Sequence, residues 1–240
     1  RENSAKFNPM TDKSSPYIPS NNSLRRESVA LRNLFSYAVD KGWVPSVPEM
    51  NTPSLVKNRR PTFTVGEWRL LTRRMREWVK EAQKWGSVGR DRFVSQQYIL
   101  ILANCGARIG ELRFLRWSDL TTQNDGDAKR LVAFVKGKTG EREIVFQQGS
   151  ERYIKRLYDL RKDELGDHPP LDGFVLCSTE GKSINSFRKG FDNLLDYCDL
   201  TYDADGNKRS LYSLRHFYAT QRLSEEVSPF LLARQMGTSV

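Results

Sequence analysis

The segment LYSLRHFYAT, residues 211–220, carries two helical spacings side by side. Apolar residues at i, i+3 and i+7 form one stripe of a helix: Leu211, Leu214 and Tyr218. Polar residues at i, i+3 and i+4 share a neighbouring face one turn apart: Tyr212, Arg215 and His216. This spacing fits a solvated or structurally paired face as well as the wall of a phosphate pocket. The function of the segment therefore depends on which partners the rest of the chain supplies.

The composition favours a polyanionic partner. The chain has 240 residues, enough for one or two domains with a buried core. Lysine and arginine number 39 against 29 aspartate and glutamate, which gives a formal net charge of +10. The positive charge is clustered at residues 25–26, 57–60 and 73–76. Clustered cations release counterions when they neutralise phosphates, so the pattern favours nucleic acid over a membrane surface.

The cysteines and the hydropathy pattern exclude other classes of protein. The three cysteines are far apart and odd in number, so neither a disulfide framework nor a zinc motif is predicted. The longest apolar run, residues 99–103, is too short to span a bilayer. No signal peptide is recognisable, and we expect a cytoplasmic protein. Because the chain starts at Arg1 without methionine and stops at Val240 in mid-pattern, we also expect a piece of a longer protein.

The hydrophobic periodicity predicts an α+β fold that is mainly α-helical with a small antiparallel sheet. Helices are predicted at residues 23–41, 64–84, 91–104, 109–117, 151–165, 187–198, 211–220 and 228–235. Strands are predicted at residues 131–136 and 142–147 around a hairpin turn, with a further short strand at 174–177. Thr64 and Glu67 have the spacing of a capping box, and Gly42 and Gly106 are expected to end helices.

These elements divide into two modules. We expect a small helical module at residues 1–57 with a disordered or extended start, a linker at residues 58–61, and a larger domain at residues 62–240. Metal and nucleotide motifs are not matched. Gly137-Lys138-Thr139 lacks the first glycine of a P-loop. Residues 203–207 lack the glutamate of a calcium loop and are expected to form a turn.

A second segment, CGARIGELRFLRWSD at residues 105–119, places Arg108 at the start of a helix. Backbone amides and the helix dipole favour an anion at such a position. Glu111, three residues later, is in reach of the Arg108 side chain. The same spacing is found in ordinary surface ion pairs, which contribute little. Arg108 is thus a candidate partner for Arg215 in binding a phosphate.

Taken with these residues, the sequence resembles the tyrosine recombinases, the site-specific recombinases of the phage-integrase type. Their first motif, Gly-x-Arg-x-x-Glu-Leu followed by Leu-x-Trp-x-Asp, is matched at residues 106–119. The family next places a lysine in a β-hairpin. Lys138 fits this position, and Lys136 is the weaker candidate by register. The resemblance extends over residues 62–240, and residues 1–57 look like the end of the core-binding domain that precedes the catalytic domain in the family.

Two further motifs are matched with one departure each. The family's His-x-x-Arg-His is found at residues 212–216, except that Tyr212 replaces the first histidine. The family's Leu-Gly-His/Trp-Ser is found at residues 236–239, with Thr238 in place of histidine or tryptophan. A phenol does not act as a base near neutral pH as readily as imidazole does. The two departures therefore bear on proton transfer and leave both arginines in place.

The resemblance implies a metal-free phosphoryl transfer that needs neither ATP nor a cofactor. Arg108 and Arg215 would hold the non-bridging oxygens of a scissile phosphate and stabilise the charge of the transition state. Lys138 would protonate the leaving 5′-oxygen. Tyr212 and Thr238 would each donate a hydrogen bond to the phosphate. Glu111 and His216 are expected to lie behind these groups.

The nucleophile of the family is a tyrosine that forms a 3′-phosphotyrosyl link to DNA. The resemblance places it shortly after the Gly-His/Trp position, which is past Val240. We assign that role to none of four tyrosines: Tyr197, Tyr202, Tyr212 and Tyr218. The catalytic domain is therefore expected to be truncated before its nucleophile, and this chain is expected not to cleave DNA on its own.

The resemblance further implies that the partner is double-stranded DNA and that the protein acts as a homotetramer on DNA. For this fragment in solution, a monomer is compatible with the resemblance. It implies a bacterial or phage-encoded protein associated with the nucleoid, with no role at a membrane. The basic residues that we expect to contact phosphates are Arg25, Arg26, Lys57, Arg59 and Arg60, for which a solvated face is an equal alternative. Two other functions stay open: a catalytically impaired DNA-binding regulator of the same fold, and a topoisomerase of type IB.

Overall fold

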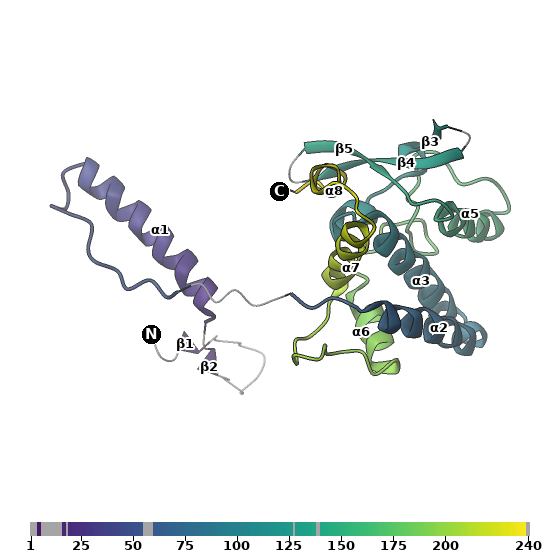
Figure 1. Cartoon of the computed structure of the whole chain (residues 1–240), viewed down its shortest axis with the longest axis horizontal. Helices are drawn as coiled ribbons and strands as arrows, with labels where there is room; N and C mark the ends of the chain where they lie inside the picture. The colour runs from purple at the N-terminus through teal and green to yellow at the C-terminus, as the bar shows by residue number, and fades with distance from the viewer. Residues whose placement is uncertain are drawn as a thin grey trace. The chain divides into compact units, whose positions relative to one another are not determined.

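The computed structural model describes residues 19–54, 60–126, 128–137 and 140–238, together with the backbone of two short strands nearer the N-terminus. The chain divides into two compact units, residues 1–59 and residues 60–240 (Figure 1). The division after Arg59 falls within the expected linker at 58–61. The two units are called unit 1 and unit 2 below.

Over its described residues, unit 1 contains a single long helix. Strands β1 (Ser4–Ala5) and β2 (Pro16–Tyr17) pair antiparallel, and α1 spans Asn21–Asp40. Ser20 caps α1 by accepting a hydrogen bond from the backbone amide of Ser23 at 3.2 Å. The predicted helix at 23–41 is thus confirmed, and Gly42 follows it with a φ of +72°. None of the residues of α1 is buried.

Unit 2 is built from seven α-helices and one antiparallel sheet, counted over the described residues. The helices are α2 (Val65–Ala82), α3 (Ser87–Cys105), α4 (Ile109–Arg113), α5 (Glu151–Leu165), α6 (Arg188–Tyr197), α7 (Leu211–Ser224) and α8 (Pro229–Met236). Two 3₁₀ turns, Gln83–Trp85 and Trp117–Asp119, follow α2 and α4. The predicted fold class, mainly α with a small antiparallel sheet, is confirmed.

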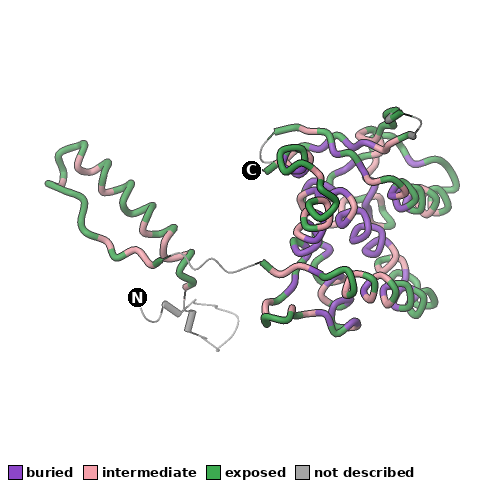
Figure 2. Tube along the Cα trace, in the orientation of Figure 1, coloured by how far each residue is buried: buried purple, intermediate pink, exposed green. Residues whose placement is uncertain are grey.

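Helix α3 lies at the centre of unit 2 and explains how the apolar sequence around it folds. Its run Tyr98–Ala103 is buried on every face, as a helix that is hydrophobic all round should be. Helices α2, α5, α6 and α7 pack against it, and Figure 2 shows the buried residues concentrated there. Gly106 ends α3 with a φ of +63°, as the sequence predicts, because a left-handed residue stops the helix there.

The sheet has the strand order β3-β4-β5, with β3 (Leu120–Asp125), β4 (Ala128–Gly137) and β5 (Gly140–Val145). The register pairs Val132 with Val145 and Gly137 with Gly140. The two predicted strands are confirmed as β4 and β5. Strand β3 was not predicted, because its sequence LTTQND is too polar to carry a period-2 signal, and its pairing with β4 depends on backbone hydrogen bonds.

Several sequence predictions need smaller corrections. The predicted helix at 109–117 ends at Arg113, and a 3₁₀ turn follows after a short break. The predicted strand at 174–177 forms only isolated bridges, at Phe174 and Cys177. The capping box is confirmed, since the Thr64 hydroxyl accepts from the Glu67 amide at 3.1 Å while Glu67 accepts from the Thr64 amide at 2.8 Å. The segment 203–207 is the expected turn, in which Asp203 accepts backbone hydrogen bonds.

A buried arginine attaches the start of unit 2 to the segment that precedes α7. Arg209 is 2% exposed and pairs with Glu67 at 2.6 Å. Its guanidinium also donates to the backbone carbonyls of Thr62, Leu200 and Tyr202. Each of these donors has an acceptor, which is what makes a buried charge tolerable. Arg209 thereby fixes where α7 begins.

Among the described helices, none combines the length and apolar character needed to cross a membrane.

Candidate functional site: an arginine cluster at the end of helix α8

Arg108 is positioned by the tight turn between α3 and α4. Gly106 ends α3, and Arg108 takes the N-cap position of α4 with extended backbone angles. Tyr98 of α3 donates from its hydroxyl to the Ile109 carbonyl at 3.2 Å, which secures the start of α4. Glu111 then accepts from the backbone amide of Arg108 at 2.8 Å and from its guanidinium at 3.0 Å. The predicted Arg108–Glu111 pair is therefore present, with the Glu111 carboxylate buried and the Arg108 side chain partly exposed.

Glu111 also binds a second arginine, Arg142 of β5. The Arg142 guanidinium reaches both carboxylate oxygens, Oε1 at 2.6 Å and Oε2 at 2.7 Å. The Glu111 side chain is only 3% exposed. Burial raises the pKa of Glu111, but the hydrogen bonds from Arg142 and Arg108 outweigh it and hold this pKa below its ordinary value. Glu111 is thus an anion held between two guanidinium groups.

Arg215 reaches the same place from α7. Its side chain is buried, and its guanidinium donates to the Gly106 carbonyl at 2.5 Å and to the Met236 carbonyl at 2.7 Å. Burial lowers the pKa of Arg215, and the nearby Arg108 lowers it further. The stripe Leu211, Leu214 and Tyr218 is buried as predicted. This stripe fixes the rotation of α7 that turns Arg215 toward the α3–α4 turn.

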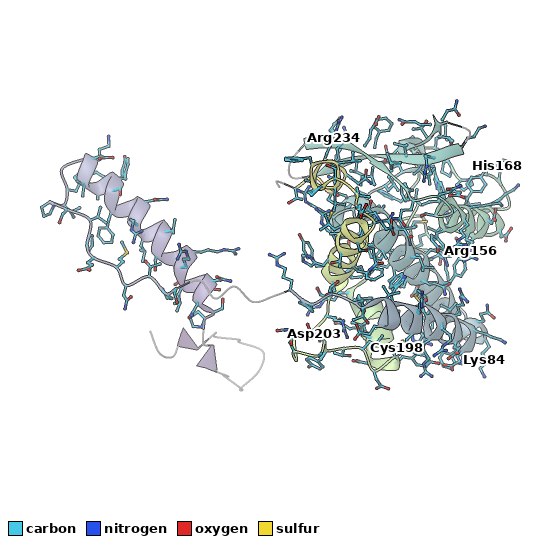
Figure 3. The ribbon with its side chains drawn as sticks, viewed as in Figure 1. Lys84, Arg156, His168, Cys198, Asp203 and Arg234 are labelled. Carbon is cyan, nitrogen blue, oxygen red and sulfur yellow. The ribbon has the colours of Figure 1, made fainter. Side chains whose placement is uncertain are left out.

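The C-terminal end of α8 is where the three arginines meet. Three successive carbonyls there each accept from a different guanidinium: Gln235 from Arg142, Met236 from Arg215 and Gly237 from Arg108. The last carbonyls of a helix have no intrahelical partner and carry a partial negative charge. Figure 3 labels Arg234 on the same last turn. The end of α8 thus fixes the three arginines relative to one another.

A pocket of about 280 Å³ opens beside this cluster. It is lined by Arg215 and Thr238 together with Tyr212, His216 and apolar residues of α7 and α8. Tyr212 is 36% exposed, and its ring lies 5.0 Å from that of His216 in an edge-to-face contact. The Arg60 guanidinium lies 5.3 Å from the Tyr212 ring. The predicted polar face of α7 therefore faces a pocket that contains an arginine and two aromatic rings.

His216 is a neutral member of this pocket. Burial lowers its pKa, and the charges of Arg60 and Arg215 lower it further. Its Nε2 atom is buried and has no hydrogen-bond partner among the described residues. An imidazole in this position does not supply a positive charge near neutral pH. Its place beside Tyr212 fits the expected supporting role.

The predicted hairpin lysine cannot be placed, because Lys138 lies outside the described residues. The residue before it is at the cluster: a β-carbon on Gly137 would lie 2.3 Å from Glu111 Oε1. Lys136, the weaker candidate, has an exposed side chain and pairs with Glu141 across the hairpin at 2.7 Å. Glycine at position 137 therefore allows the end of β4 to lie directly against the Glu111 carboxylate.

The predicted DNA-contacting residues are distributed over both units. Arg25 and Arg26 lie on α1 of unit 1, and Arg60 lies beside the pocket of unit 2. Lys57 and Arg59 lie outside the described residues. In Figure 3 the labelled His168 lies far from the labelled Cys198 and Asp203. Among the described residues, no group of three histidine, cysteine, aspartate or glutamate side chains is placed to hold a metal ion.

The comparison with family models decides the identity of the chain. Residues 71–239 match the model of the phage integrase family. The chain belongs to the phage integrase family. This match confirms the resemblance drawn from the sequence motifs. A search of curated proteins finds no match to this phage integrase chain.

Solved structures of tyrosine recombinases share the fold of this phage integrase. The XerH site-specific recombinase bound to its difH substrate has 19% identity and a TM-score of 0.65, and the match covers 92% of this chain and 59% of XerH. A lambda integrase dimer bound to a COC′ core site has 16% identity, a TM-score of 0.62 and coverages of 92% and 70%. The Tn1549 transposon integrase in complex with transposon right end DNA has 18% identity, a TM-score of 0.65 and coverages of 92% and 73%. The chain thus spans about three fifths of the XerH protein.

Sequence reasoning missed one member of the integrase cluster, Arg142. A signal for it was present in β5, where side chains alternate between the two faces of the sheet. Arg142 shares its face with Ile144, which is buried. A charged residue on the inward face of a strand requires a buried partner of opposite charge. Glu111 is that partner, 31 residues earlier in the chain.

Proposed function

We propose that this phage integrase chain is the catalytic part of a site-specific DNA recombinase. In the proposal, DNA is broken and rejoined through a 3′-phosphotyrosyl intermediate without a metal ion. The observation that carries it is the meeting of Arg108 and Arg215 on successive carbonyls at the end of α8. Two guanidinium groups held on neighbouring carbonyls, of which Arg215 lines the pocket beside α8, match the oxygens of a phosphodiester.

Each residue of the site has a role in this proposal. Arg108 and Arg215 bind the non-bridging oxygens of the scissile phosphate and stabilise the charge that develops in the transition state. Their positions are set before substrate arrives, which lowers the reorganisation needed during reaction. Lys138 protonates the leaving 5′-oxygen. Tyr212 and Thr238, which both line the pocket, donate hydrogen bonds to the phosphate.

The nucleophile in this proposal is a tyrosine in the protein past Val240. Tyr218 and Tyr197 are poor candidates for it, and Tyr212 is proposed above to donate a hydrogen bond to the phosphate. Tyr218 is buried, and burial raises the pKa of its phenol to about 12. Tyr197 donates its hydroxyl to Glu81 at 2.8 Å. A nucleophilic phenol has to be exposed next to the phosphate and to lose its proton during attack.

The proposed partner is double-stranded DNA. Several structures with the same fold are DNA complexes, including XerH on difH and lambda integrase on a COC′ core site. Arg25, Arg26, Lys57, Arg59 and Arg60 are proposed to contact phosphates, and these contacts position the protein without reading sequence. A lambda integrase tetramer bound to a Holliday junction also has this fold, and a homotetramer on DNA is proposed for the whole protein.

A covalent trapping assay tests the proposal. Binding sites are selected from a random duplex pool, and nicks are tiled through the selected site so that cleavage releases a short fragment and traps the enzyme. The protein extended past Val240 is expected to form a covalent DNA adduct in the presence of a chelator. Arg108→Ala and Arg215→Ala are expected to abolish the adduct, whereas Arg156→Ala on α5 leaves it unchanged. An unmodified protein that forms no adduct at any nick position contradicts the proposal.

A second candidate function is a DNA-binding regulator of the same fold with weak or lost catalysis. The observation in its favour is Tyr212, whose phenol faces the pocket where the family pattern has an imidazole. A phenol transfers a proton less readily than an imidazole near neutral pH. Under this alternative, the unmodified protein binds its selected DNA site without forming an adduct, and Tyr212→His restores adduct formation.

A further inference from the structure

The observation behind the inference is a three-part contact between β5, α4 and α8. Arg142 is the side chain common to all three, because it leaves β5, binds Glu111 of α4 through two hydrogen bonds and donates to the Gln235 carbonyl of α8 at 3.3 Å. Its side chain is 13% exposed. We infer that Arg142 is a positioning residue for strand cleavage, which acts on the phosphate through Glu111 and Arg108. This inference rests on the proposed function.

The geometry of Glu111 explains how the effect is transmitted. Arg142 occupies one lone pair on each carboxylate oxygen, and the Arg108 guanidinium takes a further position on Oε1 at 3.0 Å. The bidentate contact fixes the plane of the carboxylate. That plane in turn sets the direction from which Arg108 approaches Glu111. Without Arg142, both oxygens of a buried carboxylate become available to Arg108, and this arginine is drawn toward Glu111 and away from a bound phosphate.

The same contact locates the hairpin relative to the arginines. Arg142 pairs with Val135 in the β4–β5 register, and Gly137 and Gly140 form the last pair before the turn. Gly137 lies against Glu111 and Arg108. The hairpin carries Lys138, the proposed general acid. Arg142 therefore sets the distance between the hairpin and the Arg108 guanidinium, on which proton delivery to the leaving oxygen depends.

The attachment of β5 to α8 does not depend on Arg142 alone. The side-chain amide of Gln235 accepts from the Val145 amide at 3.2 Å and donates to the Val145 carbonyl at 2.8 Å. These two bonds hold the edge of β5 on α8 when the Arg142 guanidinium is removed. Loss of Arg142 is therefore expected to disturb the orientation of Glu111 and Arg108 and to leave the sheet docked on α8.

The chain contains a control arginine, Arg90, that makes no bond to the arginine cluster. Arg90 of α3 makes a two-point contact with Glu164 of α5 and donates to the Cys177 carbonyl at 3.0 Å. The Arg90 side chain is 11% exposed, close to that of Arg142. Arg90→Ala removes the same number of guanidinium contacts to a carboxylate, here the partly buried Glu164, whose side chain is 16% exposed. It is expected to lower stability in a similar way without touching the arginine cluster.

The experiment measures single-turnover adduct formation by the protein extended past Val240, on the nicked DNA described above and at saturating protein. Arg142→Ala is expected to slow adduct formation about 100-fold, the effect of displacing a reacting group by about 1 Å. Its DNA affinity is expected to be unchanged, because affinity is distributed over many phosphate contacts. Arg142→Lys keeps the charge but lacks the planar pair of N–H donors that fixes the carboxylate plane, so it is expected to recover only part of the rate.

Chemical rescue separates positioning from simple destabilisation. Guanidinium chloride at millimolar concentration can enter the space left by Arg142→Ala and bind Glu111, and it is expected to restore at least part of the rate. Sodium chloride at the same concentration is not expected to restore it, and neither salt is expected to affect Arg90→Ala. Two results would overturn the inference, provided that the unmodified protein forms adduct. One is that Arg142→Ala and Arg90→Ala form adduct equally fast. The other is that guanidinium chloride restores the rate of Arg142→Ala no more than sodium chloride does. If the unmodified protein forms no adduct, the proposed function itself fails.

Discussion

Replacing Gly106 with alanine perturbs the turn that supports the arginine cluster. Gly106 has a φ of +63°, a left-handed conformation that disfavours any residue with a β-carbon. A β-carbon added there would lie 2.3 Å from Cδ1 and 2.6 Å from Cε1 of Tyr218. The Tyr218 ring cannot easily retreat, because it packs with Leu232 and Met236 under α8. The variant therefore combines backbone strain with overpacking of a buried ring.

The two effects give an expected loss in the free energy of unfolding. A left-handed alanine costs roughly 1–2 kcal/mol relative to glycine. Forcing a methyl group into a packed site costs roughly 1–3 kcal/mol more. The sum, about 2–5 kcal/mol, corresponds to a decrease of roughly 4–20 °C in Tm for a unit of this size. Because the Gly106 carbonyl accepts from Arg215, the same change is also expected to displace this arginine.

Gly166→Ala is the matched control for the backbone contribution. Gly166 ends α5 in the same way that Gly106 ends α3, with a φ of +70°, and a β-carbon there would meet no atom within 4 Å. This control is expected to lose only the roughly 1–2 kcal/mol of the left-handed backbone. Both variants are measured by urea denaturation, followed by circular dichroism, with the unmodified chain beside them. The difference between their free energies of unfolding isolates the contact with Tyr218.

The same substitution in a chain that carries Tyr218→Leu gives a second test of the contact between positions 106 and 218. In a Tyr218→Leu chain the ring is absent, so Gly106→Ala is expected to cost no more than Gly166→Ala does. The coupling energy between positions 106 and 218 is then the cost of Gly106→Ala in the unmodified chain minus its cost in the Tyr218→Leu chain. Equal losses for Gly106→Ala and Gly166→Ala in the unmodified background would refute the reasoning, because the Tyr218 ring would then accommodate a methyl group at no cost.

Three further predictions concern the supports of unit 2. Thr64→Ala is expected to lower the free energy of unfolding by about 1 kcal/mol because the capping box of α2 is lost, and an unchanged urea midpoint would contradict this. Arg209→Met is expected to cost about 3–5 kcal/mol, since it removes the buried guanidinium that donates to Glu67 and to three backbone carbonyls; an equally stable variant would show that packing replaces the ion pair. Burial raises the pKa of Glu164, but its bonds to Arg90 and a neighbouring arginine lower this pKa by more. The net pKa of Glu164 therefore lies below its ordinary 4.5. Its ionised form therefore contributes stability above pH 4.5 that is lost as the pH falls through the lowered value. Glu164→Gln is expected to flatten the acid side of a stability–pH profile, and a profile parallel to that of the unmodified chain would argue against the pairing.

The parts of the fold that the sequence predicts are those set by neighbouring residues. The capping box at Thr64 and the helix-ending Gly106 depend on contacts within one turn, and both are present. The buried stripe of α7 follows from spacing within a single helix. The stripe also predicts the orientation of Arg215, because rotating a helix to bury one face determines where its other faces lie. Local pattern is therefore enough for the helices and for two of the three arginines at the site.

Features that depend on distant partners were not predictable in the same way. Strand β3 has few apolar residues and is held by backbone pairing with β4, so no side-chain pattern marks it. The buried position of Arg209 depends on Glu67, 142 residues earlier. The pairing of Arg108 with Glu111 was predicted, but its burial was not, because burial results from β5 and α8 covering it. The sequence pattern predicts the ion pair but not how much this pair contributes to the free energy of unfolding.

Arg142 shows how such a residue can be inferred when pattern and physical cost are considered together. The alternation of β5 places it on the inward face with Ile144, where a charge without a partner would cost several kcal/mol. An inward arginine next to a hairpin glycine therefore predicts a buried carboxylate, and Glu111 is the one that lies within reach of both Arg142 and Gly137. Helix α8 ends at Gly237 with a φ of +65°, and its last carbonyls supply acceptors to guanidinium groups that a single carboxylate cannot satisfy. The cluster is therefore best understood as one electrostatic unit, in which moving any arginine changes the acceptors available to the other two.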